Sequence, residues 1–274
     1  MKLFASLAVA TAIFAGPAYA KCSNSGAGFD QFKKEFASYA KRNGIGKRGL
    51  RELAKTKYSS KVIAYDQKIW RKAKATKGGN GSFNFDKFYN KKTAYTRQKG
   101  PSILRKHRRT FDKVERRYGV PREVLTVIWG METNFGGYMG KSDVITSLAA
   151  LSHNCRRSSL FRPHLLGALK IVDKGWMKRS QMKGAMHGEI GMTQFLAGNY
   201  AKYGVDFDRN GRVDLRRSVP DVLASTANFL RSNGWRPGQS YQPGSHNFRV
   251  LNAWNEWTAY QQTIARAAKA LERG

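Results

Sequence analysis

Residues 121–136 have the sequence PREVLTVIWGMETNFG, and this segment decides the fold that we expect. Leu125, Ile128, Trp129 and Glu132 recur at the i, i+3, i+4, i+7 spacing that places side chains on one face of an α-helix. The proline at the start of the segment suits the first turn of such a helix. The sequence therefore predicts an amphipathic helix whose apolar face ends in a carboxyl group.

The same helical spacing of apolar residues recurs on both sides of this segment. We found no convincing series of alternating strands, only a possible extended piece at residues 62–65 and a glycine-rich turn at 77–82. The chain is therefore predicted to be mainly α-helical. The other predicted helices cover residues 29–40, 49–57, 103–118, 144–151, 160–172, 220–230 and 251–271.

The charge of the chain is strongly positive, with 50 Lys and Arg against 18 Asp and Glu and a formal net charge of +32. Such a charge attracts polyanions, although a lysine-rich surface also serves solubility alone. The hydrophobic fraction of 41% in 274 residues is that of a folded globular protein. The positive charge therefore favours polyanionic binding partners, but it does not indicate which fold the chain adopts.

Residues 1–20 have the pattern of a cleaved signal peptide. Lys2 precedes an apolar run over residues 3–16, and Ala18-Tyr19-Ala20 has the small-x-small form of a signal peptidase site. The run is too short for a membrane-spanning helix, and no other segment is apolar enough for one. We expect a protein secreted across the inner membrane, periplasmic or extracellular, that meets cell wall and no nucleic acid.

The two cysteines, Cys22 and Cys155, are expected to pair, because secreted proteins fold in an oxidising compartment. Two free buried thiols are the alternative, since the sequence carries no geometry.

Glu132 is the strongest candidate for chemistry, because acids are scarce and this one ends an apolar helix face. Burial disfavours a charged carboxylate, raises its pKa and keeps a proton available near neutral pH. A general acid that protonates a sugar leaving group needs this property. The structural alternative is a carboxylate that pairs with an arginine or caps a turn. The sequence contains no HExxH, GxSxG, paired CxxC or Walker-type motif.

Several ordered motifs accompany the ETNFG sequence at residues 132–136, namely YGVP at 118–121, GEIGMTQF at 188–195 and NFLRSNGW at 228–235. Together they resemble the membrane-bound lytic murein transglycosylase B family, glycoside hydrolase family 103. The resemblance is best over residues 103–235. It implies a lysozyme-like helical core at residues 101–274, with a further helical region at 21–100 packed on it.

This resemblance also implies the reaction and its residues. The family cleaves the β-1,4 bond between N-acetylmuramic acid and N-acetylglucosamine of peptidoglycan without a cofactor, forming 1,6-anhydro-muramoyl ends. Glu132 matches the single general acid/base of the family. The substrate-binding residues implied on this chain are Gln194, Phe195, Asn134, Trp254 and Asn255.

Three positions depart from the family pattern. Trp254 replaces a tyrosine before Asn255, and Phe229 replaces another tyrosine. Glu189 stands where relatives have a small residue. We include Glu189 among the substrate-binding candidates, although an extra acid there could also raise the pKa of Glu132, bind a cation or face solvent.

Residues 206–214 match the first nine positions of an EF-hand calcium loop. Arg217 occupies position twelve, where an acid is expected, and the resemblance to the family implies a later aspartate as the closing ligand. We therefore predict a structural Ca²⁺ site, with a metal-free turn as the alternative. The candidate ligands are Asp206, Asp208, Asn210, Arg212, Asp214 and Asp221.

Three other functions stay open at this stage. The same fold could serve as a non-catalytic wall-binding protein, or as a hydrolytic muramidase with a second carboxylate. Charge and aromatic residues alone would suffice for a basic polyanion-binding protein, whose binding should weaken steeply with salt. We expect a monomer that acts on peptidoglycan glycan strands.

Overall fold

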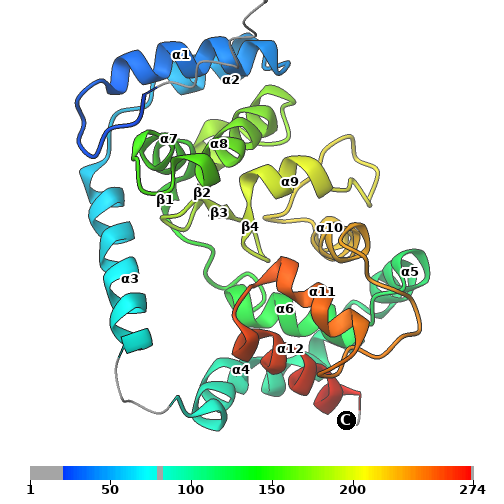
Figure 1. Cartoon of the computed structure of the whole chain (residues 1–274). Helices are drawn as coiled ribbons and strands as arrows, with labels where there is room; N and C mark the ends of the chain where they lie inside the picture. Colours follow the sequence, from blue (N-terminus) through cyan, green and yellow to red (C-terminus); the bar gives the residue numbers. More distant parts are fainter. Residues whose placement is uncertain (1–20, 79–82, 273–274) are drawn as a thin grey trace, which may run out of the picture.

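Figure 1 shows a computed structural model of the chain that describes residues 21–78 and 83–272. The predicted signal peptide and residues 79–82 of the predicted turn lie outside the described residues. The described part is mainly helical, as expected, and none of its helices is long and apolar enough to cross a membrane. The α-helices are α1 (Phe29–Arg42), α2 (Lys47–Ala54), α3 (Ser60–Gly78), α4 (Phe85–Lys106), α5 (Arg108–Tyr118), α6 (Arg122–Thr133), α7 (Val144–His153), α8 (Ser158–Asp173), α9 (Ala197–Tyr203), α10 (Val219–Ser232), α11 (His246–Trp254) and α12 (Thr258–Leu271).

Three predicted elements differ in the structure. Residues 62–65 belong to helix α3 and are not extended. The predicted helix 103–118 is two helices, because the backbone at His107 leaves helical geometry with φ −109° and ψ 20°. The predicted helix 251–271 is also two helices, α11 and α12, because Asn255 is extended. Apolar spacing continues across both breaks, so periodicity alone could not locate them.

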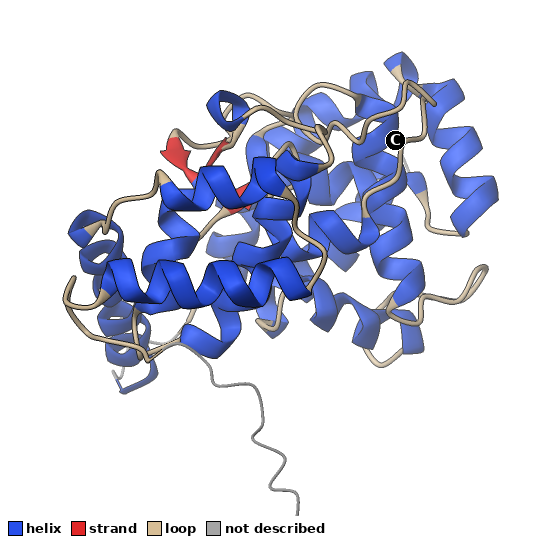
Figure 2. Cartoon of the chain, turned by 90° about the horizontal axis from the view of Figure 1, so that it is seen from above, coloured by secondary structure: helices blue, strands red, loops and turns tan. Residues whose placement is uncertain are grey.

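A small antiparallel sheet was missed altogether. Its strands are β1 (Ser142–Asp143), β2 (Lys183–Gly184), β3 (Glu189–Ile190) and β4 (Phe195–Leu196), paired in the order β1-β2-β3-β4. Two residues per strand are too few for an alternating pattern to appear in a sequence. Figure 2 shows these strands gathered at one side of an otherwise helical molecule.

Helix α6, which carries Glu132, lies at the centre of the surrounding helices. Most of its residues are buried, and α4 and α12 pack against it (Figure 1). Gly130 allows α4 to come close, because a Cβ atom there would lie 2.3 Å from Oγ1 of Thr96. Helix α4 also runs across residue 100, where we predicted the boundary between an N-terminal region and the core.

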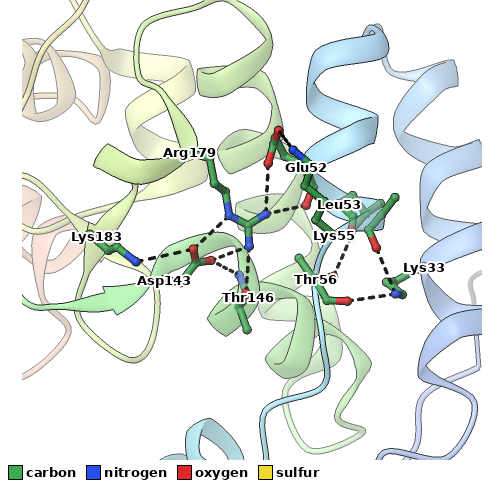
Figure 3. A network of polar contacts seen from close by, with 10 residues as sticks. Lys33, Glu52, Leu53, Lys55, Thr56, Asp143, Thr146, Arg179 and Lys183 are labelled. Atoms are coloured by element: carbon green, nitrogen blue, oxygen red, sulfur yellow. Dashed lines mark hydrogen bonds and ion pairs between the residues drawn. The ribbon is translucent and has the colours of Figure 1, made fainter.

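The N-terminal helices α1 and α2 pack on α7 and α8 at the top of Figure 1. Cys22 and Cys155 form a disulfide there, linking the start of the described chain to the segment after α7. Arg179, in the 3-10 helix η1 (Arg179–Gln181), adds a second tie, shown in Figure 3. Its guanidinium donates to both carboxylate oxygens of Asp143 at 3.0 Å and to the carbonyl oxygen of Glu52 at 2.6 Å. Asp143, one of the scarce acids, is therefore a structural residue.

Candidate active site

Glu132 lies in the last turn of α6, half-buried, with one carboxylate oxygen already engaged. Its Oε1 accepts a hydrogen bond from the hydroxyl of Tyr260 at 2.6 Å and another from Nε1 of Trp254 at 3.2 Å. These two donors come from α12 and α11, so hydrogen bonds to one oxygen atom of α6 join three helices. No cation pairs with Glu132 among the described ion pairs, which argues against the alternative of an arginine-paired carboxylate.

Burial raises the pKa of the Glu132 carboxyl above its ordinary value. The hydrogen bond from Tyr260, the positive charge of Lys92 and the hydrogen bond from Trp254 act in the opposite direction, whereas the negative charge of Glu189 adds to the rise. The net shift of the pKa is upward, as we predicted from the apolar face of the helix, so the carboxyl keeps its proton to a higher pH than an exposed glutamic acid. A carboxyl group in this state can donate a proton to a leaving oxygen.

A pocket of about 340 Å³ opens in front of Glu132. Six of the seven predicted catalytic and substrate-binding residues line it, and five of them come from two short segments of the chain, 189–195 and 254–255. The lining residues are Glu132, Ala185, Glu189, Gln194, Phe195, Leu196, Asn199, Phe229, Ala253, Trp254 and Asn255. The sequence motifs therefore converge on one cavity of a size that suits a sugar ring.

Gln194 is held in a strained turn between β3 and β4, with φ at 51°. Its side-chain amide donates to the carbonyl oxygen of Gly191 at 2.9 Å. Its carbonyl oxygen is thereby left as the group that can accept a hydrogen bond from a ligand. A sugar hydroxyl can donate a hydrogen bond to this fixed oxygen.

Phe195 is buried and packs edge-on against Trp254, with ring centroids 5.2 Å apart. Phe229 packs edge-on against both, with ring centroids 5.8 Å from Phe195 and 5.4 Å from Trp254. This three-ring cluster forms an apolar wall of the pocket and orients the indole that bonds to Glu132. Phenylalanine at position 229 thus serves packing without the hydroxyl that the family pattern has.

Asn134 is the one residue of the predicted catalytic and substrate-binding set that does not line the pocket. It ends α6 in the left-handed conformation, with φ and ψ both at 51°, and its side chain is exposed. Asparagine tolerates this conformation better than most residues, which explains its place in the motif. The neighbouring Thr133 is buried instead and bonds through its hydroxyl to the carbonyl oxygen of Met192.

Sequence reasoning missed Tyr260 and Lys92, the two residues that act on Glu132 from α12 and α4. Tyr260 is 128 residues away from Glu132 along the chain. Tyr260 lay in a predicted helix and Lys92 in none, and no spacing in the sequence relates either residue to the acid. The pocket residues Ala185, Leu196, Asn199 and Ala253 were missed for the same reason.

A second hollow of about 540 Å³ adjoins the pocket, because Ala185 and Gln194 line both. One side carries Lys61 and Tyr65 of α3, and another carries Tyr138. Exposed aromatic rings and a lysine in a hollow that adjoins the pocket of the acid suit a longer saccharide with anionic substituents.

The sequence profile described as "Transglycosylase SLT domain" matches residues 28–244. The chain belongs to this family. The match includes Glu132, Glu189 and Gln194, whereas Trp254, Asn255 and Tyr260 lie beyond it.

Three proteins illustrate the similarity of this transglycosylase SLT domain protein to known ones. Membrane-bound lytic murein transglycosylase B of Escherichia coli K12 is 36% identical over 122 residues, which cover 44% of this chain and 34% of the relative. The chain thus matches about a third of that relative's length. SltB3 from Pseudomonas aeruginosa, solved in complex with NAG-NAM-pentapeptide, is 27% identical, with a TM-score of 0.78 over 91% of this chain and 81% of SltB3.

The lytic transglycosylase Slt35 of Escherichia coli, solved in complex with calcium, shares the fold at 20% identity. Its TM-score is 0.74, with 93% of this chain and 96% of Slt35 covered. These matches confirm the lysozyme-like helical fold and the family that the motifs indicated.

The predicted calcium loop of this transglycosylase SLT domain protein brings only some of its candidate ligands together. Carboxylate oxygens of Asp206, Asp208 and Asp221 lie within 4.8 Å of one another. Asp221 is buried and accepts backbone N–H groups of Phe207 and Asp214, each at 2.8 Å. Asp221 therefore ties the two ends of the loop together through the backbone, and its role as the closing ligand stays a prediction.

Asp214, the fourth candidate acid, does not join this cluster of three acids. Asp214 turns to accept the backbone N–H groups of Arg216 at 2.9 Å and Arg217 at 3.1 Å. The side-chain oxygen of Asn210 accepts the N–H of Arg212 at 3.0 Å. These oxygens accept hydrogen bonds from nearby backbone N–H groups, which short polar side chains in turns often do. The structure thus shows a cluster of three acids, and the full EF-hand ligand set stays a prediction.

Proposed function

We propose that this protein is a peptidoglycan lytic transglycosylase that cleaves the bond between N-acetylmuramic acid and N-acetylglucosamine. One observation carries the proposal: Glu132 is half-buried in a pocket, its pKa is raised, and Tyr260 and Trp254 hold only one of its two oxygens. The second oxygen remains for chemistry. SltB3, at 27% identity, was solved with NAG-NAM-pentapeptide, which supports the same class of substrate here.

In the proposed reaction Glu132 acts twice. Its proton passes to the glycosidic oxygen while the bond from that oxygen to C1 of the muramoyl residue breaks, releasing the N-acetylglucosamine side. The carboxylate then accepts the proton of the muramoyl C6 hydroxyl, and this oxygen bonds to C1. The product is a 1,6-anhydro-muramoyl end, no water is consumed, and Glu132 is returned to its protonated form.

A hydrolytic muramidase is the second candidate, because Glu189 lines the same pocket as Glu132. A hydrolase of the inverting or retaining type uses two carboxylates. The products distinguish the two reactions, since hydrolysis leaves reducing ends and transglycosylation leaves anhydro ends. A non-catalytic wall-binding protein would not need a glutamic acid with a raised pKa and one free oxygen in its pocket.

The decisive experiment is mass spectrometry of muropeptides released from purified sacculi by the protein and by Glu132→Gln. We expect anhydro-muramoyl products from the first and none from the second. Reducing ends would favour the muramidase. No release by a folded wild-type protein would favour the binding protein and contradict the proposal.

We also infer that the protein acts as a monomer in the periplasm after removal of residues 1–20. The positive charge would hold it on the anionic wall. A structural Ca²⁺ is proposed at Asp206, Asp208 and Asp221, supported by the short distances between their oxygens. The ion would neutralise three acids and fix the loop before α10, with no part in the reaction.

A further inference from the structure

Glu189 has a carboxylate group whose hydrogen bonding is not satisfied by the described residues around it. It lines the pocket beside Glu132, and its Oε2 atom is buried without a hydrogen-bond partner among the described residues. A buried acceptor that lacks a donor costs free energy, and in a pocket open to ligands a bound molecule can supply that donor.

The backbone holds Glu189 in place on both sides. Strand β3 pairs with β2 and β4, with Glu189 opposite Leu196. The Glu189 carbonyl oxygen accepts the N–H of Ala185 at 2.9 Å, and Gly184 packs so closely that a Cβ atom there would lie 1.9 Å from this oxygen. The short sheet therefore fixes the point from which the side chain enters the pocket.

We propose that the Glu189 carboxylate binds substrate, accepting a hydrogen bond from a hydroxyl or acetamido N–H of the muramoyl residue at the cleaved bond. This inference rests on the proposed function and adds a second substrate-contacting acid to it. The ligand supplies the donor that Oε2 lacks. Sugar hydroxyls and amide N–H groups are the donors that such a residue presents, and a bond to a charged acceptor is stronger than one between neutral groups.

The negative charge of Glu189 also reaches Glu132. The groups that act on Glu132 from the surrounding elements are Tyr260 of α12, Lys92 of α4 and Glu189 of β3, in addition to the Trp254 indole. Only Glu189 among them favours the protonated acid. The two roles of Glu189 can therefore be measured separately. Substrate binding affects KM, and the electrostatic effect on Glu132 affects the pH–rate profile.

The test compares Glu189→Ala and Glu189→Gln on a soluble tetrasaccharide of alternating N-acetylglucosamine and N-acetylmuramic acid. We expect Glu189→Ala to raise KM about tenfold or more, because a hydrogen bond to a charged group is lost. Glu189→Gln keeps an acceptor oxygen and should raise KM less. Both variants remove the charge, so both should move the upper limb of the pH–rate profile to lower pH.

The control is Glu256→Gln, which removes the same charge from an exposed glutamate that does not line the pocket. It should leave KM and the pH profile unchanged. Unchanged KM in both Glu189 variants, with wild-type melting temperatures, would overturn the inference. So would reducing-end products that vanish in Glu189→Gln, since Glu189 would then activate water.

The two proposals fail in distinguishable ways. A wild-type protein that releases nothing from sacculi contradicts the proposed function. A wild type that forms anhydro ends, together with Glu189 variants that behave like it, contradicts only the inference about Glu189.

Discussion

The hydroxyl of Tyr260 donates to Oε1 of Glu132 at 2.6 Å, so the last helix of the fold holds the acid that α6 presents. Burial and the neighbouring carboxyl raise the pKa of Tyr260 well above its ordinary value, and the phenol therefore stays a donor. With Trp254 on the same atom, Oε1 is occupied and Oε2 is the oxygen available to substrate. Tyr260 is thus a positioning residue for the proposed reaction.

Removing this hydroxyl should change both the rate and its pH dependence. The hydrogen bond from Tyr260 lowers the pKa of Glu132, so Tyr260→Phe should raise this pKa further and move the upper limb of the pH–rate profile to higher pH. We expect kcat to fall about tenfold, since the carboxyl loses its fixed orientation. Muropeptide release measured across pH checks both effects.

Tyr241→Phe is the matched control, because the Tyr241 hydroxyl bonds to Glu272 instead of Glu132. Its pH profile should equal that of the wild type. A limb that moves to lower pH in Tyr260→Phe would contradict the role assigned to Tyr260.

The close packing of α4 on α6 predicts that Gly130→Ala destabilises the protein. The new Cβ atom would meet Oγ1 of Thr96 at 2.3 Å and Cζ of Phe135 at 2.9 Å. Alanine gains about 1 kcal/mol of helix propensity over glycine, but overpacking costs about 1–3 kcal/mol and should outweigh it. Urea unfolding measures the difference.

Thr96→Ala provides the paired variant for this experiment. Its buried hydroxyl oxygen has no hydrogen-bond partner in the described part of the chain, so its loss alone should cost little. The double variant should recover part of the stability that Gly130→Ala loses. Purely additive effects would show that the contact with Thr96 is not the cause.

The disulfide between Cys22 and Cys155 closes a loop with a sequence separation of 133 residues. A cross-link over so long a loop restricts the unfolded chain strongly, and its loss should cost about 2–5 kcal/mol. We expect a reducing agent to lower the melting temperature of the wild type and to leave that of the Cys22→Ser, Cys155→Ser double variant unchanged. Neither cysteine lines the pocket, so kcat at 25 °C should persist. Equal melting temperatures of oxidised and fully reduced wild type would contradict this.

The proposed calcium site predicts that Ca²⁺ raises the melting temperature of the protein. A ligand that binds only the folded state stabilises it by about 2.7 kcal/mol at a hundred times its Kd. Asp208→Asn should reduce this gain, because Asp208 is the exposed member of the cluster of three acids. Asp30→Asn, an exposed acid of α1, should leave the gain unchanged. A wild type that does not respond to Ca²⁺ favours the metal-free turn.

Local spacing in the sequence was enough to predict helix α6 and its acid. The i, i+3, i+4, i+7 pattern relates Leu125, Ile128 and Trp129 to Glu132 within two turns, and helix geometry then places them on one face. Local chemistry also placed Asp206 and Asp208 in one loop. It did not show that Asp214 turns to the backbone, because several turn conformations compete there.

The sequence by itself determined a mainly helical transglycosylase SLT domain protein with a carboxyl group at the end of an apolar helix face, since these features depend on near neighbours along the chain. The resemblance had also named Trp254 and Glu189 as site candidates, but only the tertiary structure decided that Tyr260 and Trp254 bond to that carboxyl group. Tyr260, Trp254 and Glu189 come from α12, α11 and a two-residue strand, and packing over long sequence separations brings them to Glu132. The helix break at Asn255 turns α12 toward the acid, and no periodic pattern predicts that break.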